Sequence, residues 1–382
     1  MKEYEKRTAG HIKKNPKLFW KYVNSKSKTR DCIPDLEWEQ KMVVNDNEKA
    51  EVLNSFFVST FTKENLSNVP EPRQREVTHE LEELEISCED ILKRLKKLNV
   101  NKSMGPDKIH PRVLKETAEA IKLPLQIIFK KSLQTGTIPS DWKQSHITPI
   151  HKKGSKKFPS NYRPVSLTSV VCKLLEGIIR DHIVDHFKIN GLFSTHQHGF
   201  LQGRSTITQL LETLEKWTAW LEHGNPIDVI YLDFQKAFDS VPIHRLLLKV
   251  KSYGITGNLL KWIESFLTGR QQRVNINGSK SEWKDVISGV PQGSVLGPSL
   301  FLIFINDMPE VVHAFIKLFA DDAKLFKPVP TVADCEDIQL DVRQLENWAG
   351  DWQLNFHPRK CTVLRIGKNH PDFQYKMSDS GQ

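Results

Sequence analysis

The sequence predicts an α+β fold that combines an antiparallel sheet with several amphipathic helices. Residues 315–326, FIKLFADDAKLF, contain two strand-forming apolar runs separated by two adjacent aspartates, which predicts a β-hairpin. Residues 229–232, VIYL, predict another strand. Apolar residues at helical spacing in 171–183 and 338–352 predict helices that each bury one face. With 382 residues, 38% of them hydrophobic, the chain can build two or three units around a sizeable core.

The overall composition favours a polyanionic partner. The formal charge is +9 and the pI is about 9.1, which suits nucleic acid but also fits a basic protein that is simply soluble. The apolar run at 300–305 is far too short to cross a membrane and the N-terminus is charged, so we expect no membrane span and no secretory signal. No CxxC pair supports a zinc knuckle or a disulfide framework, and we expect free thiols in a reducing compartment. The five cysteines are Cys32, Cys88, Cys172, Cys335 and Cys361.

The first ninety residues change from basic to acidic. Residues 1–31 carry ten Lys or Arg against three acids, with Phe19, Trp20 and Tyr22 among them. Such a segment can contact a template through phosphates and stacked bases, although a solvated basic helix has the same composition. Residues 71–90 hold eight acids and two arginines, which predicts a linker running into a helix.

The next part of the chain alternates turns, helices and basic loops. Residues 113–133 have helical spacing, with Pro124 as an expected break. A basic segment at 142–162 leads into NYRPVSL, and it could either meet a triphosphate or form a lysine-rich surface loop. We expect Ser166 or Thr168 to cap the helix that follows.

A second helix is predicted over residues 210–221, after a glycine-containing loop at 196–205. The apolar and aromatic residues at 210, 211, 214, 217, 220 and 221 define its amphipathic character. His196 and His198 lie two residues apart in the loop, but no other ligand pattern is near, so we interpret them as part of a turn and not as a metal site.

Three aspartates are the candidate catalytic residues. Asp233 lies where the strand predicted at 229–232 ends, on the same face as Val229 and Tyr231. Beside a hairpin bearing Asp321 and Asp322, it would complete a three-carboxylate cluster able to hold two cations about 3.5 to 4 Å apart, as in in-line phosphoryl transfer. Read alone, the Asp-Asp pair also fits a solvated acidic turn.

A glycine-rich loop lies between two further secondary-structure signals. Helices are predicted over 242–254 and 259–267, and Asn277-Gly278 predicts a hairpin between 273–276 and 283–287. Residues 288–298, SGVPQGSVLGP, allow the backbone to pass close to a ligand, and Gln292 offers both a donor and an acceptor. A Gly-Pro structural turn is the alternative interpretation. Residues 361–366 predict a closing strand, and the last dozen residues are expected to fray.

Four segments, read in order, carry a family resemblance. NYRPVSL, YLDFQKAFDSV, SGVPQGSVLGPSLFLIFIND and LFADDAKLF resemble the successive blocks of reverse transcriptases from non-LTR (LINE-type) retrotransposons, most of all the jockey-related group. The resemblance spans about residues 95–367. It implies RNA-directed DNA polymerase activity, with an RNA template, a DNA primer, deoxynucleoside triphosphates and two Mg²⁺ ions, or Mn²⁺ in their place. It also implies an intracellular location, in the nucleus or the cytoplasm.

The resemblance assigns roles residue by residue. Asp233, Asp321 and Asp322 match the metal-binding aspartates, and the backbone carbonyl of Phe234 matches a further metal ligand. Phe238 matches the aromatic residue that excludes a 2′-hydroxyl, and Lys360 matches a proposed proton donor to pyrophosphate, although His357 replaces the usual asparagine. The residues matching nucleotide- and template-contacting positions are Lys152, Arg163, Gln292 and Gly293.

The family fold is similar to a right hand. We expect a basic arm and acidic linker over 1–94, helical fingers over 95–225, an antiparallel palm over 226–368 and a polar tail over 369–382. Relatives usually carry an upstream endonuclease and a downstream thumb, and this chain stops sixty residues after Asp322, so we expect a fragment of an element with the thumb largely missing.

Two alternative functions stay open from the sequence. A palm-fold RNA polymerase would share the three acids, although Phe238 leaves little room for a 2′-hydroxyl. A weak or inactive remnant that only binds nucleic acid would share the basic segments. A reverse transcriptase and a binding remnant would both bind nucleic acid less tightly as the salt concentration rises, so salt dependence does not separate these two functions.

Overall fold

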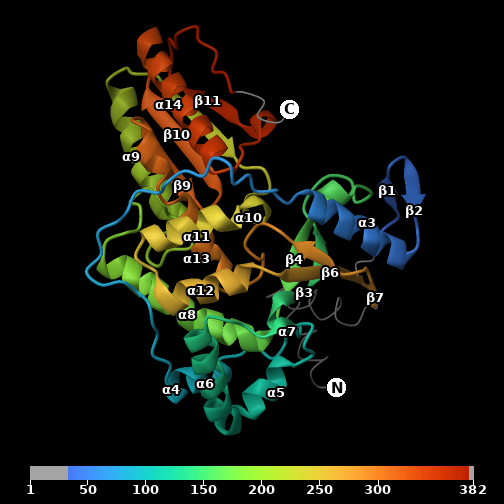
Figure 1. Cartoon of the computed structure of the whole chain (residues 1–382). Helices are drawn as coiled ribbons and strands as arrows, with labels where there is room; N and C mark the ends of the chain where they lie inside the picture. The colour runs from blue at the N-terminus through green and yellow to red at the C-terminus, as the bar shows by residue number, and fades with distance from the viewer. Residues whose placement is uncertain (1–32, 378–382) are drawn as a thin grey trace, which may run out of the picture.

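The structure is a computed structural model that describes residues 33–377. Two larger sheets, a two-stranded sheet and the helices around them make up a mixed α/β protein, in agreement with the expected mixture of helices and strands (Figure 1). The expected template contact of residues 1–31 lies outside the described residues. No helix within 33–377 combines the length and the apolar character needed to cross a membrane.

The central sheet is antiparallel and has the strand order β11-β5-β10-β9. Its strands are β5 (Ile227–Asp233), β9 (Phe315–Phe319), β10 (Asp322–Pro328) and β11 (Thr362–Ile366). The predicted hairpin is confirmed as β9 and β10, with Ala320 and Asp321 at its tip. Alternation along β5 directs Ile230 and Leu232 to one face and Val229 to the other, so each face can bury its own apolar cluster.

Helices cover both faces of this sheet (Figure 1). On the main-core face lie α11 (Ile243–Ser252), α13 (Gly297–Ile305) and α14 (Val332–Asp351). On the opposite face, Trp217 and Trp220 of α9 (Thr206–Glu222) pack against Val229 and Phe326.

The α9 helix has a different buried face from the one its sequence suggests. Leu210, Leu211 and Leu214 are 49%, 62% and 50% exposed, whereas Gln209 and Thr213 are buried. The two tryptophans at its C-terminal end fix the rotation of the helix on the sheet, and this rotation turns the leucines outward.

A second sheet stands beside the first (Figure 1). Its strands are β3 (Gln144–His151), β4 (Tyr162–Leu167), β6 (Arg270–Ile276), β7 (Ser279–Lys280) and β8 (Lys284–Val286). The Asn277-Gly278 hairpin is confirmed, with φ of +53° and +98° at its two turn residues. Because β6 pairs with β3, the 270–286 segment joins this sheet, and the region expected to be helical fingers contains strands as well.

Sequence analysis missed an N-terminal subdomain between residues 33 and 59. The hairpin of β1 (Leu36–Trp38) and β2 (Lys41–Val43) and the helix α3 (Asp46–Ser59) pack on the second sheet. Ala50, Leu53 and Phe57 are buried against Val274 and Ile147. The buried face of this helix includes the polar residues Lys49 and Asn54 beside Ala50, Leu53 and Phe57, and this mixture hides the helix from a periodicity argument.

The lower helical layer contains α4 (Cys88–Lys96), α5 (Pro111–Glu116), α6 (Ala118–Thr135), α8 (Val170–Ile189) and α12 (Gly257–Leu267) (Figure 1). The break expected at Pro124 is wrong: Pro124 lies inside α6, and the interruption falls at Thr117. Pro124 and Ala120 are on the exposed side, so water can bind the carbonyl that loses its partner, and buried Leu125 and Phe129 hold the helix.

The α8 helix buries the face that the sequence predicted, but its cap differs. The predicted face is buried throughout; its residues are Val171, Leu174, Leu175, Ile178, Ile179 and Ile183. The N-cap is Ser169, whose hydroxyl accepts from the backbone N–H of Cys172. Ser166 and Thr168 are not the cap, because β4 continues to Leu167 and leaves Ser169 as the first hydroxyl in position.

The C-terminal segment to residue 377 is packed, whereas we expected it to fray. The Tyr375 hydroxyl donates to buried Asp228 at 2.8 Å, and the Gln339 side chain bonds both backbone groups of Lys376. Phe373, Tyr375 and Met377 also contact the main core. Aromatic residues inside a polar sequence therefore anchor this segment behind α14. The four described cysteines are unpaired, as expected, and Cys32 lies outside the described residues.

A single buried arginine fastens the irregular 60–87 segment to the helices. The Arg245 side chain on α11 is 1% exposed, and its guanidinium donates to the Glu64 carboxylate and to the carbonyls of Asn65, Asn68 and Asp351. In Figure 1 the connection runs from α3 past α10 and α11 and then down to α4. Since the segment has little secondary structure, this arginine supplies hydrogen bonds that a helix or sheet would otherwise provide.

Replacement of Arg245 by methionine should therefore lower the free energy of unfolding by about 3 to 5 kcal/mol, because it leaves a carboxylate and three carbonyls without their donor. Urea unfolding followed by circular dichroism measures the change. Lys96→Met removes an exposed ion pair to Glu119 and serves as the control, with an expected change below about 1 kcal/mol. Equal effects of the two substitutions would contradict this role of Arg245.

Candidate active site

Strand pairing places two of the predicted aspartates opposite each other. Asp233 is the last residue of β5 and Asp322 the first of β10, and the two are direct partners in the antiparallel register. Partners across an antiparallel pair have side chains on the same face, so both carboxylates lie on one side of the sheet end. Asp321 precedes Asp322 at the tip of the β9–β10 hairpin.

The electrostatics of this group reflect like charges held close together. Burial raises the pKa of Asp322 above its ordinary value, and the negative charges of Asp321 and Asp233 raise it further. Hard carboxylate oxygens with mutual repulsion suit a divalent cation, so the donor set fits Mg²⁺ in its chemistry. Within residues 33–377, however, no three His, Cys, Asp or Glu side chains are gathered closely enough to hold a metal ion.

Lys360 reaches the same place from a distant part of the chain. Its Nζ lies 3.2 Å from Oδ1 of Asp233. The loop that carries it is fastened to the end of β5 by backbone bonds from His357 N to Asp233 O and from Gln235 N to Asn355 O. The ring of Phe234 is buried and stacks on the ring of Phe356, with centroids 4.5 Å apart, and this contact also holds the loop.

Further basic side chains lie near the carboxylates. Lys152 follows β3 and Arg163 lies on β4, with Ile150 paired to Arg163 across the strands. Partial burial lowers the pKa of Lys152, and the charges of Arg163 and Lys360 lower it further while Asp233 opposes them. The charges of Lys152 and Arg163 in turn lower the pKa of Asp322, so these two basic residues lie within electrostatic range of the aspartates.

Lys236 belongs to this cation group, although sequence analysis missed it. Burial lowers the pKa of Lys236, as do the charges of Lys152, Lys360 and Arg163. Its backbone has φ of +46°, in the left-handed region, and its Nζ lies 5.2 Å from the ring centre of Phe56 on α3. Neither the strained backbone nor the contact with α3 is visible in the local sequence.

An aromatic pair supports the residue expected to recognise the sugar. Phe238 lies on the short helix α10 (Ala237–Ser240) and is half-buried. Its ring stacks on Phe301 of α13, with centroids 4.6 Å apart and planes at 16°. The stack leaves the side chain little freedom to turn away, so one face of the site has a fixed apolar wall.

The glycine-rich loop is seated directly on β4. Ser166 N donates to the carbonyl of Gln292 at 2.8 Å. Gly293 has φ of +113°, and a Cβ atom there would lie 2.6 Å from the Ser166 carbonyl oxygen. Glycine is therefore required at 293 by both its conformation and the close approach of the two backbones.

Asp239 is a buried carboxylate that the sequence analysis did not identify. Its Oδ1 accepts a hydrogen bond from Nε2 of Gln292 at 3.0 Å, which orients the glutamine amide. Burial raises the pKa of Asp239 to about 6, and the charges of Lys236 and Arg163 oppose this only in part. Asp239 follows Phe238 directly, so one short helix contributes to both the aromatic wall and the glutamine. The only sequence signal for Asp239 was its position directly after Phe238, a predicted site residue.

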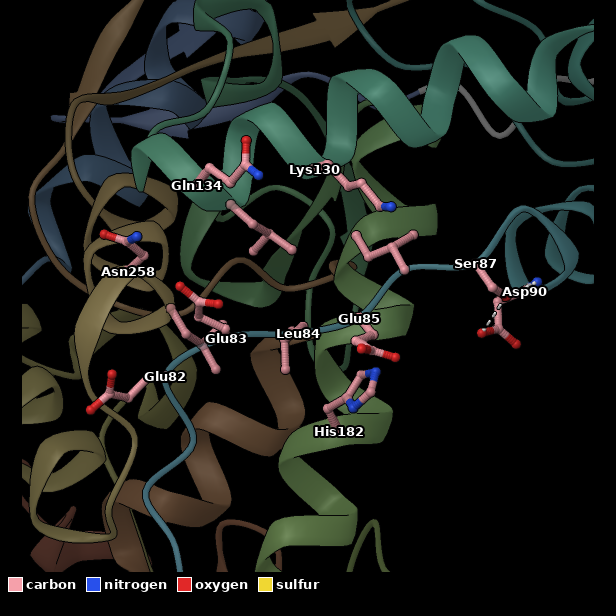
Figure 2. Close-up of a pocket in the computed structure, with 13 residues that line it drawn as sticks. Glu82, Glu83, Leu84, Glu85, Ser87, Asp90, Lys130, Gln134, His182 and Asn258 are labelled. Carbon is pink, nitrogen blue, oxygen red and sulfur yellow. Dashed lines mark hydrogen bonds between the residues drawn. The ribbon is translucent and has the colours of Figure 1, made fainter.

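A groove outside this site has the wrong charge for nucleic acid. It has a volume of about 610 Å³ and lies between the acidic 82–90 segment, α6 and α8 (Figure 2). Four carboxylates line it, from Glu82, Glu83, Glu85 and Asp90, and none of the predicted site residues does. A polyanion would be repelled there.

Two carboxylates, Asp233 and Asp322, lie opposite each other at the strand ends, with Asp321 next to them in the chain and with basic side chains within electrostatic range. Such a site can bind a polyphosphate through Lys152, Arg163 and Lys236, next to oxygen ligands for a divalent cation. The predicted residues from both sheets thus meet at one place.

Comparison with known proteins identifies the class. The chain belongs to the family described as reverse transcriptase (RNA-dependent DNA polymerase), whose pattern matches residues 150–376, more than half of the chain. A polymerase palm fold accords with this membership.

The relatives come from non-LTR retrotransposons. The chain is 31% identical over 300 residues to the probable RNA-directed DNA polymerase from transposon BS of Drosophila melanogaster, covering 73% of this chain and 32% of that protein. It is 30% identical over 334 residues to the RNA-directed DNA polymerase from mobile element jockey of the same species, covering 82% and 36% respectively. A Pol polyprotein from the R1 element of Bradysia coprophila is 27% identical, over 74% and 28%. The chain thus spans about a third of these relatives' length, and the expected resemblance is confirmed.

The raised pKa of Asp239 gives a pH-dependent prediction. The folded protein holds this proton up to about pH 6, whereas the unfolded chain releases it near pH 4, so this carboxyl lowers the stability of the fold as pH rises between these values. Asp239→Asn keeps an oxygen for Gln292 and removes the charge. It should raise the free energy of unfolding by about 2 kcal/mol at pH 7.5 and by little at pH 4.

Urea unfolding at the two pH values tests this expectation. Asp185→Asn, at an exposed carboxyl on α8, is the matched control and should change stability little at either pH. An Asp239→Asn protein that is less stable than the wild type at pH 7.5 would show that the ionised carboxylate is well solvated or paired.

Proposed function

We propose that this chain is an RNA-directed DNA polymerase that adds deoxynucleotides to a DNA primer on an RNA template. The observation that carries the proposal is the opposition of Asp233 and Asp322 across β5 and β10, with Asp321 beside them, in a member of the reverse transcriptase family. Family membership does not by itself say where the carboxylates lie; the register of β5 and β10 supports the proposal because it pairs Asp233 with Asp322. The match covers only 32% and 36% of the two relatives named as RNA-directed DNA polymerases, so the activity of this chain is itself part of the proposal.

The carboxylates would hold two divalent cations, Mg²⁺ or alternatively Mn²⁺. Asp233, Asp321, Asp322 and the backbone carbonyl of Phe234 are the proposed ligands. When bound, such ions lower the pKa of a primer 3′-hydroxyl and neutralise charge on a triphosphate. Lys360, now paired with Asp233, would be released by the cations and become free to protonate the departing pyrophosphate.

The other site residues would bind and orient the incoming nucleotide. Lys152 and Arg163 would hold the triphosphate; the proposal is supported by their position directly after β3 and on β4, within electrostatic range of the aspartates. Gln292 and Gly293 would lie beneath the template and the nucleotide. Phe238, held by its stack on Phe301, would crowd a 2′-hydroxyl and favour deoxynucleotides, which argues against the RNA polymerase alternative.

In terms of a right hand, we propose fingers over about 95–225 and a palm over about 226–368. The strands at 270–286 extend the fingers sheet, because β6 pairs with β3. The palm would be the central sheet with α11, α13 and α14 behind it. An intracellular location, where RNA template and DNA primer meet, suits this function.

Primer extension on an RNA template with Mg²⁺ tests the proposal. The 382-residue protein should add deoxynucleotides in short, distributive runs, and Asp321→Ala/Asp322→Ala should lower the rate by at least about a thousandfold, as expected when the charge that stabilises the transition state is lost. Asp337→Ala, on the exposed surface of α14, is the control with unchanged extension. Incorporation by the double variant at the wild-type rate would refute the catalytic assignment.

Parallel reactions with ribonucleotides separate the alternatives. The wild-type protein should prefer deoxynucleotides, and Phe238→Ala should gain ribonucleotide incorporation; an RNA polymerase would use ribonucleotides from the start. A folded protein that binds primer–template but incorporates nothing at any concentration would favour the binding remnant.

A further inference from the structure

A loop outside the predicted catalytic segments lies along the free edge of the catalytic hairpin. His198 N donates to Leu318 O, and Leu318 N donates to His196 O, both at 2.9 Å. His196 adds a ring contact, from Nδ1 to the carbonyl of Ile316. Residues 196–198 therefore form an isolated parallel bridge beside β9, which covers the edge of the hairpin at Leu318.

The tip of that hairpin has an unfavourable backbone conformation. Ala320 has φ of +55°, in the left-handed region where a residue with a Cβ is strained. It is also 5% exposed, so water cannot easily satisfy its N–H. A buried and strained peptide directly before Asp321 persists only if the surroundings hold it.

The side chain of Gln197 holds this peptide. Gln197 is 3% exposed, and its Oε1 accepts from Ala320 N at 3.0 Å and from Gly199 N at 2.7 Å. Two backbone N–H groups point at the same atom, so that atom must be the amide oxygen and not the nitrogen. One side-chain oxygen thus joins the loop and the hairpin tip.

The loop is itself closely fitted to the tip. A Cβ atom on Gly199 would lie 2.4 Å from Ala320 N, so only glycine allows this approach. From the other side, Nη1 of Arg204 donates to the carbonyls of Ser194, Thr195 and Gln197. The position of the Gln197 backbone is therefore determined independently of the hairpin.

We propose that Gln197 is a positioning residue for the catalytic carboxylates: it fixes the Ala320 peptide so that Asp321 and Asp322 face Asp233. The inference rests on the proposed function for its catalytic consequence, but the clamp itself is a property of the fold. Without the amide oxygen, the Ala320 N–H is buried and unpaired, and the tip can relax toward an unstrained φ. Such a change rotates the peptide next to Asp321 and moves the carboxylates relative to Asp233.

Three variants isolate the amide oxygen. Gln197→Leu keeps the approximate volume and removes the acceptor, whereas Gln197→Glu keeps an acceptor in the same place. Gly199→Ala separates the loop from the tip without touching Gln197. Gln339→Leu is the matched control, because Gln339 is a buried glutamine that also bonds backbone groups, those of Lys376, far along the chain from the hairpin.

Two measurements on the 382-residue protein need no turnover. Hydrogen exchange of the Ala320 amide should accelerate about tenfold or more in Gln197→Leu and Gly199→Ala, and remain slow in Gln197→Glu and Gln339→Leu. Binding of Mn²⁺ alone, followed by electron paramagnetic resonance, should weaken about fivefold or more in the first two variants only, because the ligands no longer converge.

Steady-state kinetics then separate positioning from nucleotide binding. The kcat for primer extension should fall about tenfold or more in Gln197→Leu, with the KM for deoxynucleotide changed by less than about twofold, and Gln197→Glu should recover most of the rate. Folding of each variant is verified by its thermal unfolding. A folded Gln197→Leu protein with slow Ala320 exchange and wild-type Mn²⁺ affinity would overturn the inference.

The two proposals can fail separately. If the wild-type protein incorporates no nucleotide, the proposed function fails, and the exchange and Mn²⁺ measurements still decide the role of Gln197. If the wild-type protein is active and all three quantities are unchanged in Gln197→Leu, the proposed function stands and the role of Gln197 is refuted.

Discussion

The antiparallel register of β5 and β10 is the constraint on which the site depends. It sets Asp233 against Asp322, and a slip of one residue would turn one carboxylate to the opposite face of the sheet. Burial of both faces opposes such a slip, because Ile230 and Leu232 fill the main core while Val229 and Phe326 pack under the tryptophans of α9. The apolar residues of these strands therefore fix the register that sets Asp233 against Asp322.

Charge balance at the strand ends comes from other parts of the chain. Lys360 arrives on a loop fastened to β5, and Lys152 and Arg163 arrive on the second sheet. Without cations, three neighbouring carboxylates would repel one another and destabilise the hairpin tip. The same basic residues are suited to bind a triphosphate, so one group of side chains can stabilise the empty site and receive the substrate.

Much of the central sheet could be predicted, because short stretches of sequence determine its strands. The β9–β10 hairpin, the strand ending at Asp233 and the buried face of α8 all follow from periodicity over a few residues. The residues proposed as catalytic were predicted from resemblance together with these strands. Their convergence at one sheet end needed only the assumption that β5 pairs with the hairpin.

The features that escaped prediction depend on tertiary contacts. Asp239 and Gln197 are polar residues that are important because of their hydrogen bonds in the folded chain. Asp239 accepts from Gln292, and Gln197 accepts from the Ala320 N–H. The orientation of α9 is set by two tryptophans that pack on the sheet, and it leaves three leucines exposed. Pro124 is tolerated because its side of α6 faces solvent. Propensity and spacing contain none of this information.

The most direct test of the account is the number of Mn²⁺ ions bound by the protein with a chain-terminated primer, an RNA template and the next deoxynucleotide, counted by electron paramagnetic resonance. If Asp233 and Asp322 share a two-cation site, the wild-type complex should hold two ions more than its Asp233→Asn/Asp322→Asn counterpart. Equal numbers of ions in the two complexes would contradict the claim that this strand register builds a polymerase active site.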